Sequence, residues 1–68
     1  MIQNDRELHV TLERISRLQD QVALIRETET NPQNYRHSAS GFLAELDRMN
    51  LEVREYLWTH PGELAASK

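Results

Sequence analysis

Two stripes of apolar positions with a seven-residue repeat dominate the sequence. The first stripe alternates steps of three and four residues and has one polar member: Leu8, Thr11, Ile15, Leu18, Val22 and Ile25. The second stripe keeps the same alternation: Tyr35, Ala39, Phe42, Leu46, Met49, Val53 and Tyr56. This spacing is typical of the contact seam of a coiled coil, and neither stripe has the period of two that a half-buried strand requires. The pattern therefore predicts an all-α chain with two helices.

Superposing the two stripes predicts an antiparallel hairpin. In an antiparallel helix pair, the a positions of one heptad face the d positions of the other. The resulting pairs are Leu8–Tyr56, Thr11–Val53, Ile15–Met49, Leu18–Leu46, Val22–Phe42 and Ile25–Ala39. This register centres the chain reversal at residue 32, where Asn31 is a favoured N-cap and Pro32 suits the first position of a helix. We call the residues of the two stripes the hairpin seam.

The predicted domain is a single helical hairpin covering residues 1–68. Its helices span about residues 5–28 and 32–59, with a turn at about residues 28–31. The second helix is expected to stop at His60, Pro61 and Gly62, because a proline pushes the residue before it out of the α region. The tail, residues 61–68, is expected to fray.

Two helix starts stay open. Asn4 begins a pattern that resembles a capping box, and Thr11 is a competing start for the first helix. The second helix begins either at Pro32 or near Gly41, with Ser40 as the cap in the second case. A glycine inside a helix costs about 1 kcal/mol relative to alanine, which is the main argument for the later start.

Apolar residues also occur off the seam. In the second helix Ala44, Leu51 and Trp58 repeat every seven residues on the side away from the seam, and Leu43 and Leu57 flank them. Single exposed leucines are normal on protein surfaces, but residues in register indicate a contact face. A second contact also suits a chain of 68 residues without cysteine, since small domains commonly depend on oligomerisation. The candidate oligomer or partner face comprises Leu12, Leu43, Leu51, Leu57 and Trp58.

Composition supports a helical protein of this kind and excludes several partners. Charged residues make up 28% of the chain and there are only two glycines and two prolines, which disfavours a β-rich domain with many turns. The net charge is −3, so no direct nucleic-acid binding is expected. The opening MIQNDRELHV lacks the apolar core of a signal peptide, and no apolar run approaches the roughly 18 residues of a membrane span. We expect a soluble, cytoplasmic protein.

Residues with potential chemistry do not assemble into a recognisable site. His9 and Glu13 have a spacing that can hold a metal, but no further ligands accompany them. Ser38 and Ser40 lack a histidine–acid pair placed by a motif to activate them. We therefore expect no catalytic, cofactor or metal site.

The acidic residues of the second helix could suggest a di-iron bundle, whose Glu-x-x-His motifs face the interior. Here no histidine follows these acids by three residues, and they lie off the seam: Glu45, Asp47, Glu52 and Glu55. We expect them to pair with Arg48 and Arg54, and across the hairpin with Arg14 or Arg17.

Two short stretches resemble a known bacterial segment. They comprise Ile2, Asn4, Arg6, Glu7, Val10 and Thr11 near the start, and Glu52, Val53, Glu55, Tyr56 and Leu57 later. Together they resemble the helical segment of toxin–antitoxin-type loci that often precedes an Xre-type helix-turn-helix antitoxin domain, in its stand-alone form. The resemblance implies a bacterial, cytoplasmic, dimerising coiled-coil module. The DNA-binding role is not carried over, because no helix-turn-helix follows His60 in this sequence.

The sequence thus predicts a non-enzymatic protein–protein interaction and oligomerisation module of antitoxin-like or regulatory type. The expected assembly is a homodimer in which two hairpins form a four-helix bundle, with a toxin as a candidate protein partner. The alternative is an accessory transcription factor that acts through a DNA-binding partner.

Overall fold

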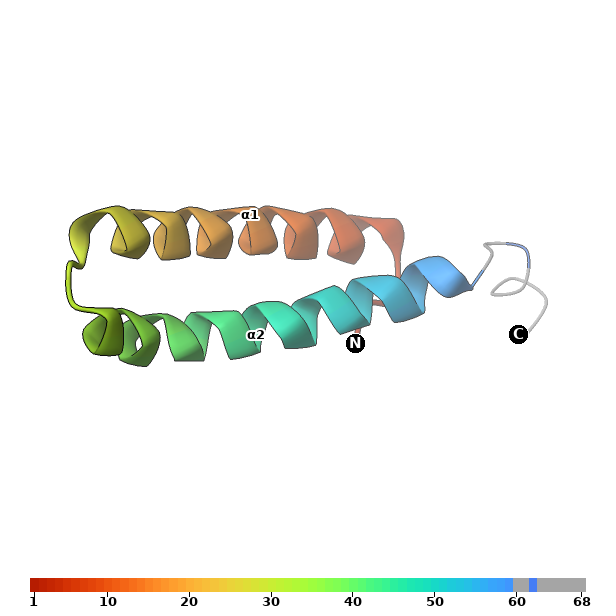
Figure 1. Ribbon diagram of the computed structural model, residues 1–68. Coiled ribbons are helices and arrows are strands. Elements are labelled where there is room, and N and C mark those ends of the chain that lie inside the picture. The colour runs from red at the N-terminus through yellow and green to blue at the C-terminus, as the bar shows by residue number, and fades with distance from the viewer. Residues whose placement is uncertain (60–61, 63–68) are drawn as a thin grey trace.

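The computed structural model describes residues 1–59 and 62, and it shows two helices packed side by side in opposite directions (Figure 1). Helix α1 spans Asp5–Thr28 and helix α2 spans Pro32–Trp58. The molecule is long and thin, with extents of 52 × 16 × 12 Å. The prediction of an all-α antiparallel hairpin is confirmed. The expected fraying of residues 61–68 falls almost wholly outside the described residues.

Helix α1 begins at the earlier of the two starts that the sequence left open. The Asn4 side-chain oxygen accepts a hydrogen bond of 2.8 Å from the backbone N–H of Glu7. The Glu7 carboxylate in turn accepts one of 2.9 Å from the backbone N–H of Gln3. These bonds satisfy N–H groups that have no partner inside the helix, and the acidic first turn complements the helix dipole.

The turn consists of residues 29–31, and α2 starts directly after it. Asn31 caps α2, its side-chain oxygen accepting hydrogen bonds from the backbone N–H groups of Gln33 at 2.9 Å and Asn34 at 3.3 Å. Pro32 occupies the first turn, where its missing N–H group costs nothing. The later start near Gly41 is wrong, because the helix runs without a break from Pro32 to Trp58.

Gly41 lies in the middle of α2 and is exposed. A Cβ atom built on it meets no other atom within 4 Å, and its φ angle is not positive. Any L-residue can therefore adopt the backbone conformation of Gly41. The unfavourable effect of glycine here is the conformational entropy that it loses on folding.

Replacing Gly41 by alanine is therefore expected to raise the free energy of unfolding by about 1 kcal/mol, because alanine loses less backbone freedom on folding. For a domain of this size the melting temperature should rise by about 4–8 °C, measured by circular dichroism. Ser40→Ala next to it is the control, with a smaller effect expected. An unchanged or lower melting temperature for Gly41→Ala would contradict the open surroundings of this residue.

The hairpin seam forms the core. Its buried members are Ile15, Ala39, Leu46 and Met49, and its other members are half-buried. Ile15, Leu46 and Met49 form one cluster, against which Leu18, Val22 and Val53 pack. This cluster includes both members of the predicted pairs Ile15–Met49 and Leu18–Leu46.

The polar seam residue Thr11 is half-buried without an unsatisfied hydroxyl group. Its Oγ1 donates a hydrogen bond of 2.9 Å to the backbone oxygen of Glu7 in the same helix. Among the described residues, no buried side-chain nitrogen or oxygen lacks a partner. Threonine at this layer of the seam therefore leaves no hydroxyl group unpaired, and its only disadvantage is that it fills less apolar volume than a larger side chain.

Candidate functional site

The candidate face that the sequence singled out is exposed in the single chain. Trp58 is 83% exposed and Leu57 is 62% exposed, although both are large apolar side chains. Leu51, Leu43 and Leu12 follow at 54%, 45% and 42%. We call the members of this face on α2, together with Ala44, the α2 stripe: Leu43, Ala44, Leu51, Leu57 and Trp58.

Leu12, which lies on α1, joins the α2 stripe along one flank of the seam. It directly follows the seam residue Thr11, just as Leu43 follows Phe42 and as Leu57 follows Tyr56. In an antiparallel helix pair, the positions that follow a d residue flank the seam on the same side. Three exposed leucines, Leu12, Leu43 and Leu57, therefore lie on the same flank of the seam.

The opposite flank is charged. Arg48 pairs with Glu45 and, at 3.4 Å, with Glu52 on the same helix. The positive charge of Arg14 on α1 also acts on Glu45 across the hairpin. The expected pairing of the α2 acids with Arg48 is thus present.

Two other expected ion pairs are absent from the described structure. Arg17 instead pairs with Glu13 on its own helix at 3.6 Å, since residues four apart are neighbours on the surface of a helix. Arg54 makes no ion pair or hydrogen bond among the described residues and is exposed, as is Asp47.

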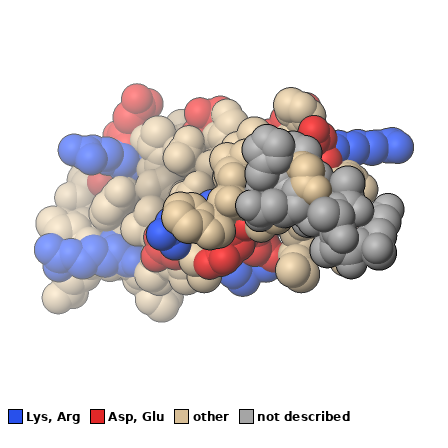
Figure 2. Space-filling view, turned by 90° about the vertical axis from the view of Figure 1, so that its right-hand side faces the viewer, with Lys and Arg blue, Asp and Glu red and all other residues tan. Residues whose placement is uncertain are grey.

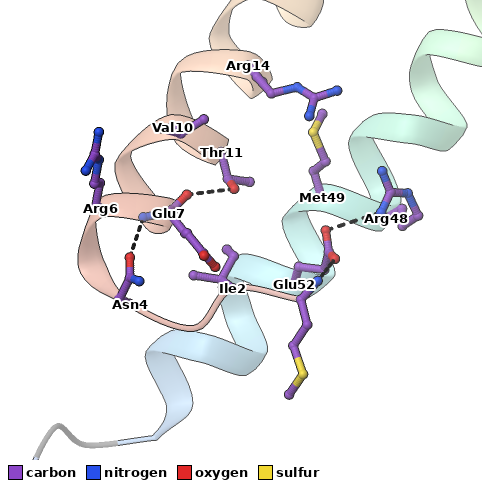
Figure 3. A pocket seen from close by; sticks show the side chains of 11 residues that line it. Ile2, Asn4, Arg6, Glu7, Val10, Thr11, Arg14, Arg48, Met49 and Glu52 are labelled. Atoms are coloured by element: carbon purple, nitrogen blue, oxygen red, sulfur yellow. Dashed lines mark hydrogen bonds and ion pairs between the residues drawn. The ribbon is translucent and has the colours of Figure 1, made fainter.

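An N-terminal strap, residues 1–4, closes the open end of the hairpin on this charged flank (Figures 1 and 3). Ile2 is only 7% exposed and lies between α1 and α2. The Met1 ammonium group donates a hydrogen bond of 2.9 Å to the carboxylate of Glu52. Just beyond the strap, the Tyr56 hydroxyl donates one of 2.6 Å to the carboxylate of Asp5.

Sequence reasoning missed the burial of Ile2. Its only signal was an apolar residue shortly before the N-cap Asn4, one position earlier than in a hydrophobic staple. Glu52, which binds Met1 of the strap, and Tyr56, which binds Asp5 beside it, each lie 51 residues from their partner along the chain. No local pattern encodes contacts at that distance.

The contacts at this end shift four pKa values, among them that of Arg48, which the hydrogen bond to Glu45 raises. The hydrogen bond from the Met1 ammonium group, followed by the charges of that group and of Arg48, lowers the pKa of Glu52. The hydrogen bond from Arg48 likewise lowers the pKa of Glu45. The hydrogen bond to Asp5, together with partial burial, raises the pKa of the Tyr56 hydroxyl.

These shifts predict a pH window for stability. Glu45 and Glu52 have lowered pKa values in the folded state, so their contribution is present above the unfolded value of about 4.3 and is lost as the pH falls through the folded pKa. Tyr56 has a raised pKa, so its contribution is present below about pH 10 and is lost as the pH rises further.

Urea unfolding from pH 2 to 7 should show that the free energy of unfolding falls below about pH 5.

The Glu52→Gln variant should flatten this acid dependence. The matched control is Glu55→Gln, which lies on the same helix, is exposed and makes no ion pair among the described residues. If both variants have the same acid dependence as the unmodified chain, the contact between Met1 and Glu52 does not stabilise the fold.

A hollow of about 580 Å³ lies beside the strap between the two helices (Figure 3). Ile2, Thr11 and Met49 line it together with Arg14 and Arg48. Figure 2 shows this end of the molecule, where acidic and basic side chains are interspersed rather than gathered by sign. The hollow is open to solvent and contains no arrangement of a nucleophile with an activating base.

The other residues with potential chemistry remain apart. His9 is exposed on α1, and no group of three or more potential metal-ligating residues occurs in the described part of the chain. Ser40 donates a hydrogen bond of 3.0 Å to the backbone oxygen of His37, and Ser38 is exposed. His60 lies outside the described residues. Neither described helix has the length and apolar character needed to cross a membrane.

Comparisons with family models, with curated proteins and with solved structures find no match. The resemblance to the toxin–antitoxin segment therefore rests on the two short stretches of sequence alone.

Proposed function

We propose that this chain is a non-enzymatic protein–protein interaction module that oligomerises through the α2 stripe. The observation that carries the proposal is the exposure of Trp58, at 83%, in line with three exposed leucines on the same helix. Large apolar side chains that lie exposed in register along one helix commonly mark a protein interface. Tryptophan is also among the residues that contribute most to binding at interfaces.

The shape of the hairpin supports the same proposal. A molecule with extents of 16 and 12 Å across its long axis has room for a single seam of side chains. Packing two hairpins against each other through the α2 stripe gives a four-helix bundle, in which the stripe becomes part of a second core. A homodimer in the cytoplasm is the assembly that we propose.

An antitoxin-like or regulatory role is the biological setting that the sequence resemblance implies, and it stays a prediction. It requires a further partner, such as a toxin, that binds the assembled hairpins. No feature of the described residues favours the alternative of an accessory transcription factor.

Size-exclusion chromatography with light scattering tests the proposal. At about 100 µM the unmodified chain should elute with a mass above the monomer value of 8.0 kDa. The variant Leu51→Ser/Trp58→Ser should elute as a monomer with unchanged helicity, because both positions are exposed in the single chain. Leu24→Ser on α1, 53% exposed in the single chain and outside the stripe, is the control and should retain the assembly. A monomeric, folded unmodified chain would disprove the proposal.

A further inference from the structure

The exposed face of α2 has the same arrangement of residue types in both directions along the helix. An apolar pair, Leu43 and Ala44, lies at one end, and another, Leu57 and Trp58, lies at the other. Leu51 is near the centre. Between the centre and the ends lie Asp47 on one side and Arg54 on the other. All these positions are exposed, and their spacing places them on one side of the helix.

When a second copy of α2 runs in the opposite direction, its residues in this order match those of the first copy. If the α2 helix of a second copy runs antiparallel, with a two-fold axis beside Leu51, residue 47 of one copy lies opposite residue 54 of the other. Each apolar pair then lies opposite the apolar pair of the second copy. We propose that the partner of the α2 stripe is a second copy of this chain, bound with α2 antiparallel to α2 about this axis. This inference rests on the proposed function and specifies its partner and orientation.

Charge determines the orientation. In the antiparallel arrangement Asp47 of each copy faces Arg54 of the other, which gives two attractive pairs related by symmetry. A parallel arrangement places Asp47 opposite Asp47 and Arg54 opposite Arg54, which is repulsive at both positions. Both side chains are available for such pairs, since neither makes an ion pair or hydrogen bond among the described residues.

Size supports the same orientation. Ala44, the smallest residue of the stripe, comes opposite the large side chain of Leu57 of the second copy, and Leu43 comes opposite Trp58, so that a small side chain faces a large one in each apolar pair. In the parallel arrangement the two tryptophans would meet each other and the two alanines would leave a gap. From the exposed fractions of Leu43, Leu51, Leu57 and Trp58, the two copies together bury on the order of 1,000 Å². This area is at the low end for specific interfaces.

Reversal of the two charges tests the orientation. The chains compared are the unmodified protein, Asp47→Arg, Arg54→Asp and the double exchange Asp47→Arg/Arg54→Asp, with sedimentation equilibrium giving the dissociation constant of each. Each single variant turns two attractive pairs into two repulsive ones and should weaken the dimer about tenfold. The double exchange restores attraction and should recover the original dissociation constant. Asp20→Arg, an exposed charge reversal on α1, is the matched control and should change nothing.

The outcomes separate this inference from the proposed function. Weakening in both single variants with recovery in the double exchange supports the antiparallel dimer. Equal dissociation constants in all four chains overturn the antiparallel orientation while leaving oligomerisation intact, because a parallel pair keeps like charges opposite in every variant. Weakening without recovery overturns the direct pairing of Asp47 with Arg54. Four folded monomers, with helicity confirmed by circular dichroism, overturn the proposed function as well.

Discussion

Replacing Leu46 by alanine is expected to lower the free energy of unfolding by about 2–5 kcal/mol, the largest effect of any single truncation considered for this chain. Leu46 is 6% exposed and belongs to the cluster with Ile15 and Met49 that joins the two helices. Truncation removes apolar burial and leaves a cavity that neighbouring side chains fill only in part. Since a small domain has a total stability of about 5–15 kcal/mol, the loss is a large fraction of the whole.

Urea unfolding followed by circular dichroism measures this loss as a lower midpoint concentration. The matched control is Leu24→Ala, the same chemical change at a position on α1 that is 53% exposed. Its effect should stay within about 0.5 kcal/mol, as for most surface substitutions. Equal shifts of the midpoint for Leu46→Ala and Leu24→Ala would mean that the seam is not the core of the fold.

Replacing Ile2 by alanine is expected to lower the free energy of unfolding by about 1–2 kcal/mol. Full burial of an isoleucine side chain stabilises a protein by about 1.5–3 kcal/mol, and Ile2 is 7% exposed. The loss is smaller than for Leu46 because the strap can detach. When the strap detaches, the chain loses the contacts of the strap but regains the conformational entropy of its residues. The free energy of unfolding therefore falls only by the difference between the two.

Val10→Ala is the control for this second substitution. Val10 lines the same hollow as Ile2 but is 52% exposed, so its truncation should change the unfolding midpoint little. Nuclear magnetic resonance of the Ile2→Ala variant should also show changed signals at Glu52 and Tyr56, whose partners lie on or beside the strap. An unchanged midpoint for Ile2→Ala would show that the strap covers the hairpin without stabilising it.

The exposed α2 stripe was visible in the sequence, whereas the charged flank was only partly so. Ala44, Leu51 and Trp58 are separated by single heptads, so one helix is enough to align them. The α2 acids were predicted to pair across the hairpin with Arg14 or Arg17, but the structure pairs Arg17 with Glu13 on its own helix. Long charged side chains have many rotamers, and a sequence pattern does not determine which acid within reach becomes the partner.

By itself, the sequence determined the two helices, the turn between them and the antiparallel pairing. These features depend on local signals, because a heptad repeat places apolar residues on one side of a helix, and Asn31 and Pro32 are residues favoured at the N-cap and in the first turn. In one register of the two helices, every seam residue of the first helix faces a seam residue of the second. All these layers are apolar on both sides except the layer that contains Thr11.

Only the tertiary structure decided the continuity of α2 through Gly41 and the position of the strap. Ala39 before Gly41 and Phe42 after it both belong to the seam, and both lie on the same side of one continuous helix. Their packing outweighs the unfavourable helix propensity of glycine. The strap depends on which part of α2 lies beside the start of α1. Ile2 becomes buried there because the folded hairpin brings Met49 and Glu52 next to it, and no local sequence pattern carries that information.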